Sequence, residues 1–142
     1  MAVPWPENLS AGCSIGDIFQ FYGEPAFRDV EKKVLRRLVN DNTGVIATGG
    51  GAFINDETRG YLLDNTVVIW LDADIDTLFD RISGHTHRPL LKTADPKAKL
   101  SELLDARKQY YSAAHIKVKS EDVKLSQTLD AVISELDSYL AR

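Results

Sequence analysis

The chain has 142 residues, of which 44% are hydrophobic and 27% charged, and its formal net charge is −4. These values fit one folded domain and argue against a general nucleic-acid surface, which would carry excess positive charge. A single cysteine, Cys13, excludes an intramolecular disulfide framework and favours a reducing compartment. We expect a cytoplasmic protein with no membrane partner, because the sequence has no secretion signal and no apolar run of roughly 20 residues.

Two helical patterns occupy the first third of the chain. Ser14 is a good N-cap with Asp17 at the capping-box position, and Gly23 is a natural stop for the helix between them. Apolar residues then recur at helical spacing over 28–40, which predicts a second helix. The prolines within residues 1–11 make that segment a poor strand.

Two apolar runs predict buried strands, "GVIAT" at 44–48 and "TVVIWLDA" at 66–73. The second run is continuous, so we expect it to be covered on both faces, as in a parallel sheet. Asn55 is expected to cap a short helix between the strands, and Asp74 to cap a helix after the second one.

The last third of the chain begins with a polar, basic stretch at 83–95, which predicts a mobile loop. Asp95 and Pro96 form an N-cap and N1 pair that opens a helix. "IKVKS" predicts a short strand near a sheet edge, and an amphipathic helix from Leu125 to at least Leu136 follows. Strands that alternate with helices predict an α/β layered fold with a parallel sheet.

Three consecutive glycines, Gly49, Gly50 and Gly51, follow the first predicted strand. In parallel sheets ligands bind at the carboxyl ends of strands, where glycines expose backbone N–H groups and allow close approach. A tight turn without a ligand is the alternative. The triplet does not match G-x-G-x-x-G, and no lysine follows it as in a phosphate loop.

Three arginines stand out by position. Arg28 begins a helix, where the helix dipole disfavours a cation; the alternative to a ligand role is an exposed charge or an ion pair with a nearby glutamate. Arg107 follows an apolar stripe and is otherwise an ordinary solvated residue. Arg88 lies in the predicted loop, where a lid arginine could close over a phosphate.

The histidines do not predict a metal site. His85 and His87 have no cysteine or carboxylate partner nearby in the sequence, which favours solvated loop residues. His115 precedes a predicted strand, and we expect it to be structural.

Four stretches together resemble the shikimate kinase family: "SIGDIFQFYGEPAFRDVE", "VIATGGGAF", "RISGHTHRPLL" and "LLDARKQYY". They run in the right order from about residue 12 to the final helix. The resemblance implies a three-layer parallel sheet of the P-loop nucleoside-monophosphate-kinase type. It also implies transfer of the γ-phosphate of ATP, with Mg²⁺, to the 3-hydroxyl of shikimate by a monomeric enzyme of aromatic amino-acid synthesis.

The resemblance also implies roles for individual residues. Arg28 would grip the shikimate carboxylate, Glu31 would orient Arg28, and Arg107 would contribute to the same anion. Arg88 would meet the transferred phosphate and Arg81 would lie near the adenine, while no metal ligand is assigned. The rest of the substrate pocket would be formed by Phe19, Phe27, Gly49, Gly50 and Gly51.

The phosphate loop that such kinases need, G-x-x-x-x-G-K-[ST], does not occur in this sequence. In the family it precedes the matched region, on the first strand of a sheet ordered 2-3-1-4-5. We therefore expect residues 1–11 to be a non-matching segment, residues 12–142 to be a partial kinase domain lacking the first two strands, and two strands to have open edges. The chain is expected to be inactive and poorly stable alone.

Three explanations of the missing loop stay open: a fragment, a misassigned start codon, or one half of an assembly completed by another segment. Two alternative functions also stay open. One is a non-catalytic remnant that binds shikimate or a partner protein, and the other is a related small-molecule kinase such as a gluconate kinase.

Overall fold

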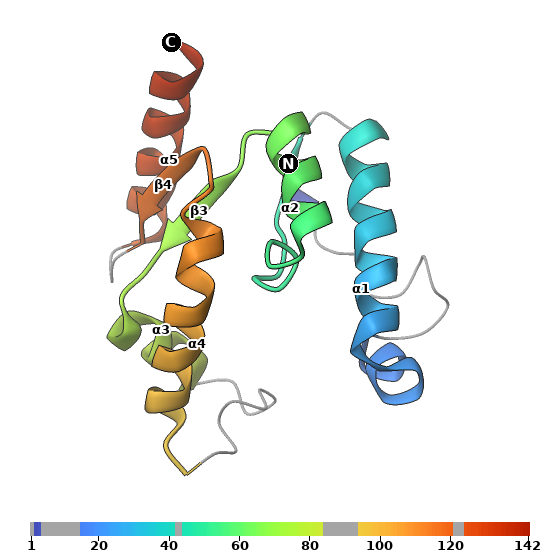
Figure 1. Ribbon diagram of the computed structural model, residues 1–142. Helices are drawn as coiled ribbons and strands as arrows, with labels where there is room; N and C mark the ends of the chain where they lie inside the picture. Colours follow the sequence, from blue (N-terminus) through green and yellow to red (C-terminus); the bar gives the residue numbers. More distant parts are fainter. Residues whose placement is uncertain (1, 4–14, 42–43, 84–93, 121–123) are drawn as a thin grey trace. The chain divides into compact units, whose positions relative to one another are not determined.

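The computed structural model describes residues 2–3, 15–41, 44–83, 94–120 and 124–142 (Figure 1). The chain forms two compact units, Met1–Thr66 and Val67–Arg142. Within the described ranges, no helix has the length and apolar character needed to cross a membrane. The first unit contains β1 (Ala2–Val3), α1 (Ile15–Asp41), β2 (Val45–Ile46) and α2 (Asp56–Asn65). The second contains β3 (Ile69–Asp72), α3 (Ile75–Ser83), α4 (Pro96–Tyr111), β4 (Ile116–Lys119) and α5 (Leu125–Leu140).

Helix α1 joins the two predicted helical segments across a kink at Gly23. This glycine has φ 79° and ψ 174°, a conformation outside the helical region that suits a residue without a side chain. The predicted stop at Gly23 is therefore confirmed as a break within a longer element. Pro25 follows at the start of the second segment, where its missing N–H group costs no helical hydrogen bond. The predicted N-cap, Ser14, lies outside the described residues.

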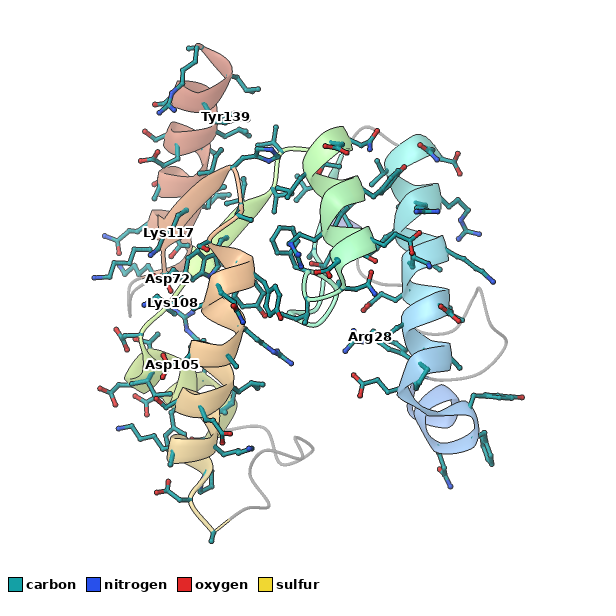
Figure 2. All side chains as sticks on the ribbon, viewed as in Figure 1. Arg28, Asp72, Asp105, Lys108, Lys117 and Tyr139 are labelled. Carbon is teal, nitrogen blue, oxygen red and sulfur yellow. The ribbon has the colours of Figure 1, made fainter. Side chains whose placement is uncertain are left out.

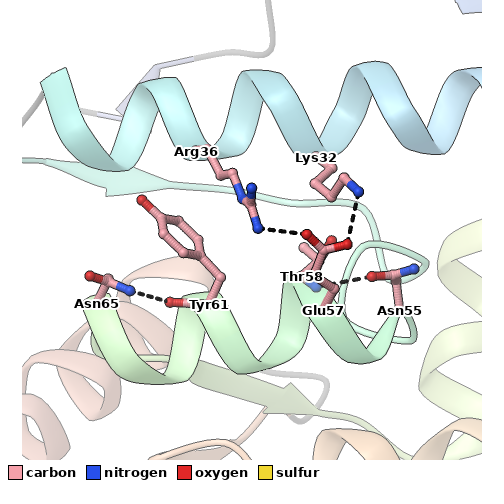
Figure 3. Close-up of polar contacts among 7 residues, drawn as sticks. All are labelled: Lys32, Arg36, Asn55, Glu57, Thr58, Tyr61 and Asn65. Atoms are coloured by element: carbon pink, nitrogen blue, oxygen red, sulfur yellow. Dashed lines mark hydrogen bonds and ion pairs between the residues drawn. The ribbon is translucent and has the colours of Figure 1, made fainter.

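Helix α2 packs beside α1 in the first unit. Its predicted N-cap is confirmed, since the Asn55 side chain accepts a hydrogen bond of 2.9 Å from the Thr58 backbone N–H. Figure 3 shows Lys32 and Arg36 of α1 donating to the two carboxylate oxygens of Glu57 in α2, at 2.8 and 2.7 Å. Beneath these surface contacts lies the apolar core of the unit, which comprises Phe27, Val34, Leu35, Ala52, Phe53 and Leu62.

The strands of the first unit differ from the prediction. Strand β2 covers Val45–Ile46 and pairs in parallel with β1, whereas a buried strand over 44–48 was expected. Val45 is 63% exposed, although it pairs with Ala2 of β1. Residues 1–11, expected to be a poor strand, contain the two-residue strand β1. The prolines follow Val3, so Ala2 and Val3 keep their N–H groups for pairing.

In the second unit β3 pairs in parallel with β4, with Ile69 opposite Ile116 and Asp72 opposite Lys119. The predicted alternation of the last strand is confirmed, since Ile116 is buried and Lys117 is exposed. The prediction that β3 is covered on both faces is wrong: none of its residues is buried, and Leu71 is 54% exposed.

The open edges expected from the family's strand order are present in the described part of the chain. Beyond β4, no other described strand pairs with β3, and β2 pairs with β1 alone. An unpaired edge leaves N–H and C=O groups without partners and side chains without cover. This explains the exposure of strand residues that sequence patterns assign to a sheet interior.

The helices of the second unit begin where predicted. The Asp74 side chain accepts a hydrogen bond of 2.8 Å from the Thr77 N–H group, and Asp95 accepts one of 3.0 Å from the Ala98 N–H group. Helix α3 packs against α4, and α5 packs against β4. No described residue of α5 is buried, and Leu125 is 86% exposed. Apolar side chains of α5 are therefore exposed.

Candidate functional site

The Arg28 guanidinium group lies directly against the backbone of Gly51. A Cβ atom placed on Gly51 would lie 2.7 Å from both Cζ and Nη1 of Arg28, closer than real Cβ contacts approach. Figure 2 shows Arg28 projecting from α1 on the side of the glycine segment. The two features that the sequence analysis singled out separately therefore form one site within the first unit. Position 51 requires glycine because the Arg28 guanidinium leaves no room for a Cβ atom. Backbone conformation is not the reason, since the φ of Gly51 is not positive.

The glycine segment folds as two successive turns. The Ala52 N–H group donates to the Gly49 carbonyl at 3.1 Å, and the Ile54 N–H group donates to the Gly51 carbonyl at 3.2 Å. Ala52 is 1% exposed and Phe53 is 7% exposed, so the turns are anchored in the core of the unit. A ligand at this turn would meet a backbone that is already fixed.

Two glutamates hold the Arg28 side chain. Arg28 Nη1 donates to Glu31 at 2.7 Å and Nη2 donates to Glu24 at 3.3 Å. Glu31 is buried, whereas the Glu24 side chain is 65% exposed. The Cζ atom of Arg28 also lies 5.1 Å from the centroid of the buried Phe27 ring, a cation–π contact. The ion pairs proposed as alternatives for Arg28 thus coexist with its contact at the glycine turn.

The electrostatics keep Arg28 charged. Burial is the largest single influence and lowers the pKa of the Arg28 guanidinium. The hydrogen bond and charge of Glu31, together with those of Glu24, outweigh it and raise the pKa above the ordinary value. A permanently charged guanidinium with donors to spare is suited to a carboxylate ligand, because Arg has five N–H groups and only two are used by the glutamates.

The remaining predicted arginines lie in the second unit or outside the described residues. Arg107 lies in α4 and makes no hydrogen bond or ion pair with any described residue. Arg81 lies at the end of α3, where its Nη1 donates to the Ser120 hydroxyl at 3.0 Å. It also lines a pocket with four other residues, Asp74, Asp76, Thr77 and Asp80. Arg88 and the predicted loop around it fall outside the described residues.

Three other predicted residues need separate mention. Gly50 lies inside the turn between its two neighbours. Phe19 lies in α1, and only its backbone is described. His115 is structural, as expected: its Nδ1 accepts a hydrogen bond of 3.0 Å from the Val68 N–H group, and its ring lies 5.8 Å from that of Tyr139. His85 and His87 lie outside the described residues.

One arginine beside the glycine turn was not predicted from the sequence. Arg59 of α2 donates through Nη1 to the carbonyl oxygens of Phe53 and Ile54, at 3.3 and 3.1 Å, and through Nη2 to Asp56 at 2.6 Å. Its side chain is 20% exposed. The sequence feature that could have identified Arg59 is its position near the start of a short helix, where the helix dipole disfavours positive charge.

No magnesium ligand can be assigned among the described residues. Across the described ranges, no group of three or more histidine, cysteine, aspartate or glutamate side chains is placed to hold a metal ion. Mg²⁺ in phosphoryl-transfer sites is held by one or two carboxylates, with water and substrate phosphates as its other ligands. The described side chains therefore do not single out a ligand for this ion.

The structure thus combines an α/β arrangement of elements with an arginine whose guanidinium group lies against a glycine turn. The chain belongs to the shikimate kinase family, whose model matches residues 8–137. It is 43% identical over 135 residues to the shikimate kinase of Nitrobacter winogradskyi and 42% identical over 129 residues to that of Caulobacter vibrioides. These matches cover 95% and 91% of this chain but only 63% and 64% of the relatives.

Solved structures agree with this assignment. The shikimate kinase of Acinetobacter baumannii in complex with shikimate matches with a TM-score of 0.76 and 31% identity, covering 89% of this chain and 70% of that one. The shikimate kinase of Aquifex aeolicus matches with a TM-score of 0.75 and 30% identity, covering 89% of this chain and 73% of that one. The predicted family and α/β fold class are confirmed.

Proposed function

We propose that this protein binds shikimate at the Arg28–Gly51 site and forms the acceptor-substrate part of a shikimate kinase, which transfers the γ-phosphate of ATP to the 3-hydroxyl group. The observation that carries the proposal is the Arg28 guanidinium against the glycine turn. A neighbour in the family was solved with shikimate bound, which supports this choice of ligand.

The chemistry of the site favours a carboxylate ligand. A planar guanidinium can bind both oxygens of a carboxylate, which lysine cannot do with the same geometry. The contact with Glu24 is the longer of the two glutamate contacts and is exposed. A shikimate carboxylate would therefore replace Glu24, while Glu31 keeps the guanidinium in place. The glycine turn would leave room for the ring and its hydroxyl groups.

Further residues belong to the proposal through the family. Arg107 would add a second cation to the carboxylate, and its lack of a partner among the described residues agrees with that role. Phe27, and Phe19 with it, would shape the pocket. Arg81 would lie near the adenine, and Arg88 would meet the transferred phosphate. Gly49 and Gly50 would lie with Gly51 along the substrate.

Catalysis is a separate matter from binding. The sequence has no G-x-x-x-x-G-K-[ST] motif, so we propose that the chain by itself does not turn over ATP. Mg²⁺ supplies charge neutralisation at the phosphates in reactions of this class. We assign it no ligand among the described residues. A cytoplasmic, monomeric enzyme without a nucleic-acid or membrane partner completes the proposal, and the net charge of −4 is in keeping with it.

Calorimetric titration of the purified chain with shikimate tests the proposal. We expect binding to wild type, and Arg28→Lys should weaken it about 10-fold or more, because a charged hydrogen-bonded contact contributes roughly 1.5–3 kcal/mol. Shikimate methyl ester is the matched ligand, since it lacks the carboxylate charge. Arg28→Lys should change the affinity for the ester little. An equal loss for both ligands would contradict the carboxylate assignment, and absence of shikimate binding would contradict the proposed function.

A complementary measurement addresses catalysis. Shikimate-dependent ATP hydrolysis or phosphoryl transfer should be undetectable with this chain alone. Appreciable turnover would show that nucleotide is held by other means. In a form that includes a phosphate loop, Arg28→Lys should raise KM for shikimate far more than KM for ATP.

A further inference from the structure

The backbone that follows the glycine triplet has carbonyl groups that need partners. The carbonyls of Phe53 and Ile54 precede the N-cap Asn55, so neither accepts a hydrogen bond within α2. Both lie beside the buried core of the unit, where an unpaired carbonyl is costly. Nη1 of Arg59 donates to both of them.

The Arg59 side chain therefore links the turn at Phe53 and Ile54 to the first turn of α2. Its second terminal nitrogen, Nη2, forms an ion pair of 2.6 Å with Asp56 in the first turn of α2. The backbone of Arg59 is fixed as well, because its N–H group donates to the Asn55 carbonyl at 2.9 Å. A single guanidinium thus contacts three acceptors that come from successive parts of one loop-to-helix junction.

This junction is hydrogen-bonded to Gly51. The Ile54 N–H group donates to the Gly51 carbonyl, and the Ile54 carbonyl accepts from Arg59. Arg28 approaches Gly51 so closely that no side-chain atom fits between them. A shift of the turn would therefore change the gap that faces the Arg28 guanidinium.

We propose that Arg59 is a positioning residue for the shikimate site, because its guanidinium fixes the turn at Phe53 and Ile54 and so sets the contact between Gly51 and Arg28. The inference rests on the proposed function for its choice of ligand. Arg59 acts through the backbone and does not contact the substrate itself. Lysine would keep the charge but lacks the planar fork that reaches several acceptors at once.

The test compares Arg59→Gln and Arg59→Lys with Arg36→Gln in the full chain. Arg36 is the matched control, since it also contacts α2, through Glu57 and over the Tyr61 ring, but makes no contact with the turn carbonyls. We expect the Kd for shikimate to rise about 10-fold in Arg59→Gln, about 3-fold in Arg59→Lys and less than about 2-fold in Arg36→Gln. Wild-type affinity in a folded Arg59→Gln would overturn the proposal.

A second measurement separates positioning from general stability and does not need the ligand. In ¹H–¹⁵N spectra, Arg59→Lys should move the amide signals of Gly51, Ala52 and Ile54 and the Arg28 Nε–H signal, whereas Arg36→Gln should leave them in place. If Arg59→Gln does not fold, both the Kd for shikimate and the spectra are judged on Arg59→Lys. If wild type fails to bind shikimate, the proposed function is wrong, but the spectra still test the role of Arg59. Amide signals of the turn that do not move in Arg59→Lys would overturn the positioning role of Arg59.

Discussion

The guanidinium of Arg28 fills the space in which a side chain on Gly51 would stand, with Cζ 2.7 Å from the position of an added Cβ. Gly51→Ala should therefore push the guanidinium away from the turn. The loss of folding stability should be small, because the far end of a side chain can move. Shikimate binding should weaken about 10-fold or more, measured by calorimetry, since the carboxylate contact loses its geometry.

Gly44→Ala is the control for that substitution. An added Cβ at Gly44 meets no described residue within 4 Å, so this change should leave both the affinity for shikimate and the unfolding midpoint close to wild type. Equal affinities in Gly51→Ala and Gly44→Ala would show that the contact at Gly51 has no role in binding.

The two glutamates around Arg28 should have opposite effects on binding. Glu24→Gln removes an exposed charge that competes with a ligand carboxylate, so shikimate should bind more tightly. Glu31→Gln weakens the buried 2.7 Å contact that orients the guanidinium, so shikimate should bind several-fold more weakly. Titration calorimetry at low ionic strength measures both. A tighter Glu31→Gln variant would refute the orienting role.

Gly23 and Gly60 offer a test of backbone conformation. Alanine at position 23 must adopt φ 79° and ψ 174°, so Gly23→Ala should lower the free energy of unfolding by about 1–3 kcal/mol. Gly60 lies inside α2 with open space around it, and Gly60→Ala should raise the same quantity by up to about 1 kcal/mol. Urea unfolding followed by circular dichroism measures both. Stabilisation by Gly23→Ala would mean that the kink is not populated in solution.

The Glu57 contacts predict a pH-dependent part of stability. The hydrogen bond from Lys32, aided by the charges of Lys32 and Arg36, lowers the pKa of the Glu57 carboxyl from its ordinary value of 4.5. A carboxyl with a lowered pKa stabilises the folded state above the unfolded pKa and loses this effect as pH falls through the folded pKa. The urea midpoints of wild type and Glu57→Gln should therefore differ at neutral pH and converge in acid.

Salt provides the check on that prediction. Glu57 is exposed, so about 1 M NaCl should shrink the difference at neutral pH by screening the charges. A difference that persists unchanged in acid and in salt would mean that Glu57 acts by packing and not by charge.

His115 should affect folding and not ligand binding. His115→Ala leaves the Val68 N–H group without its acceptor, which should cost about 1–3 kcal/mol of unfolding free energy. Shikimate affinity should stay near wild type, because His115 contacts the Val68 N–H group and the Tyr139 ring, neither of which is assigned to the substrate. If the affinity fell by more than the loss of stability accounts for, His115 would have a role in the shikimate site.

Local sequence signals predicted the helix boundaries well. Asn55, Asp74 and Asp95 are N-caps in the structure, and Gly23 breaks α1. These features depend on side chains that bond to backbone groups three residues away, so neighbouring residues suffice to predict them. The alternation of β4 was also predicted from neighbouring residues, because successive side chains of a strand point to opposite faces.

Strand burial was predicted less well. The apolar runs around Val45 and Leu71 indicate a sheet interior, yet both residues are more than half exposed. Burial depends on what packs against a strand, and no described strand pairs with the free edges of β2 and β3. The brief β1 at Ala2 was missed because nearby prolines weigh against a strand until its partner is known.

The sequence by itself determined the family, the glycine triplet and the identity of the arginines, because these are properties of residue type and order. Only the tertiary structure showed that Arg28 lies against Gly51 and that Arg59 donates to the carbonyl groups of the same turn. The first contact joins α1 to the glycine turn, and the second joins α2 to the turn before it. Their distances follow from packing in three dimensions, which residue spacing along the chain does not specify.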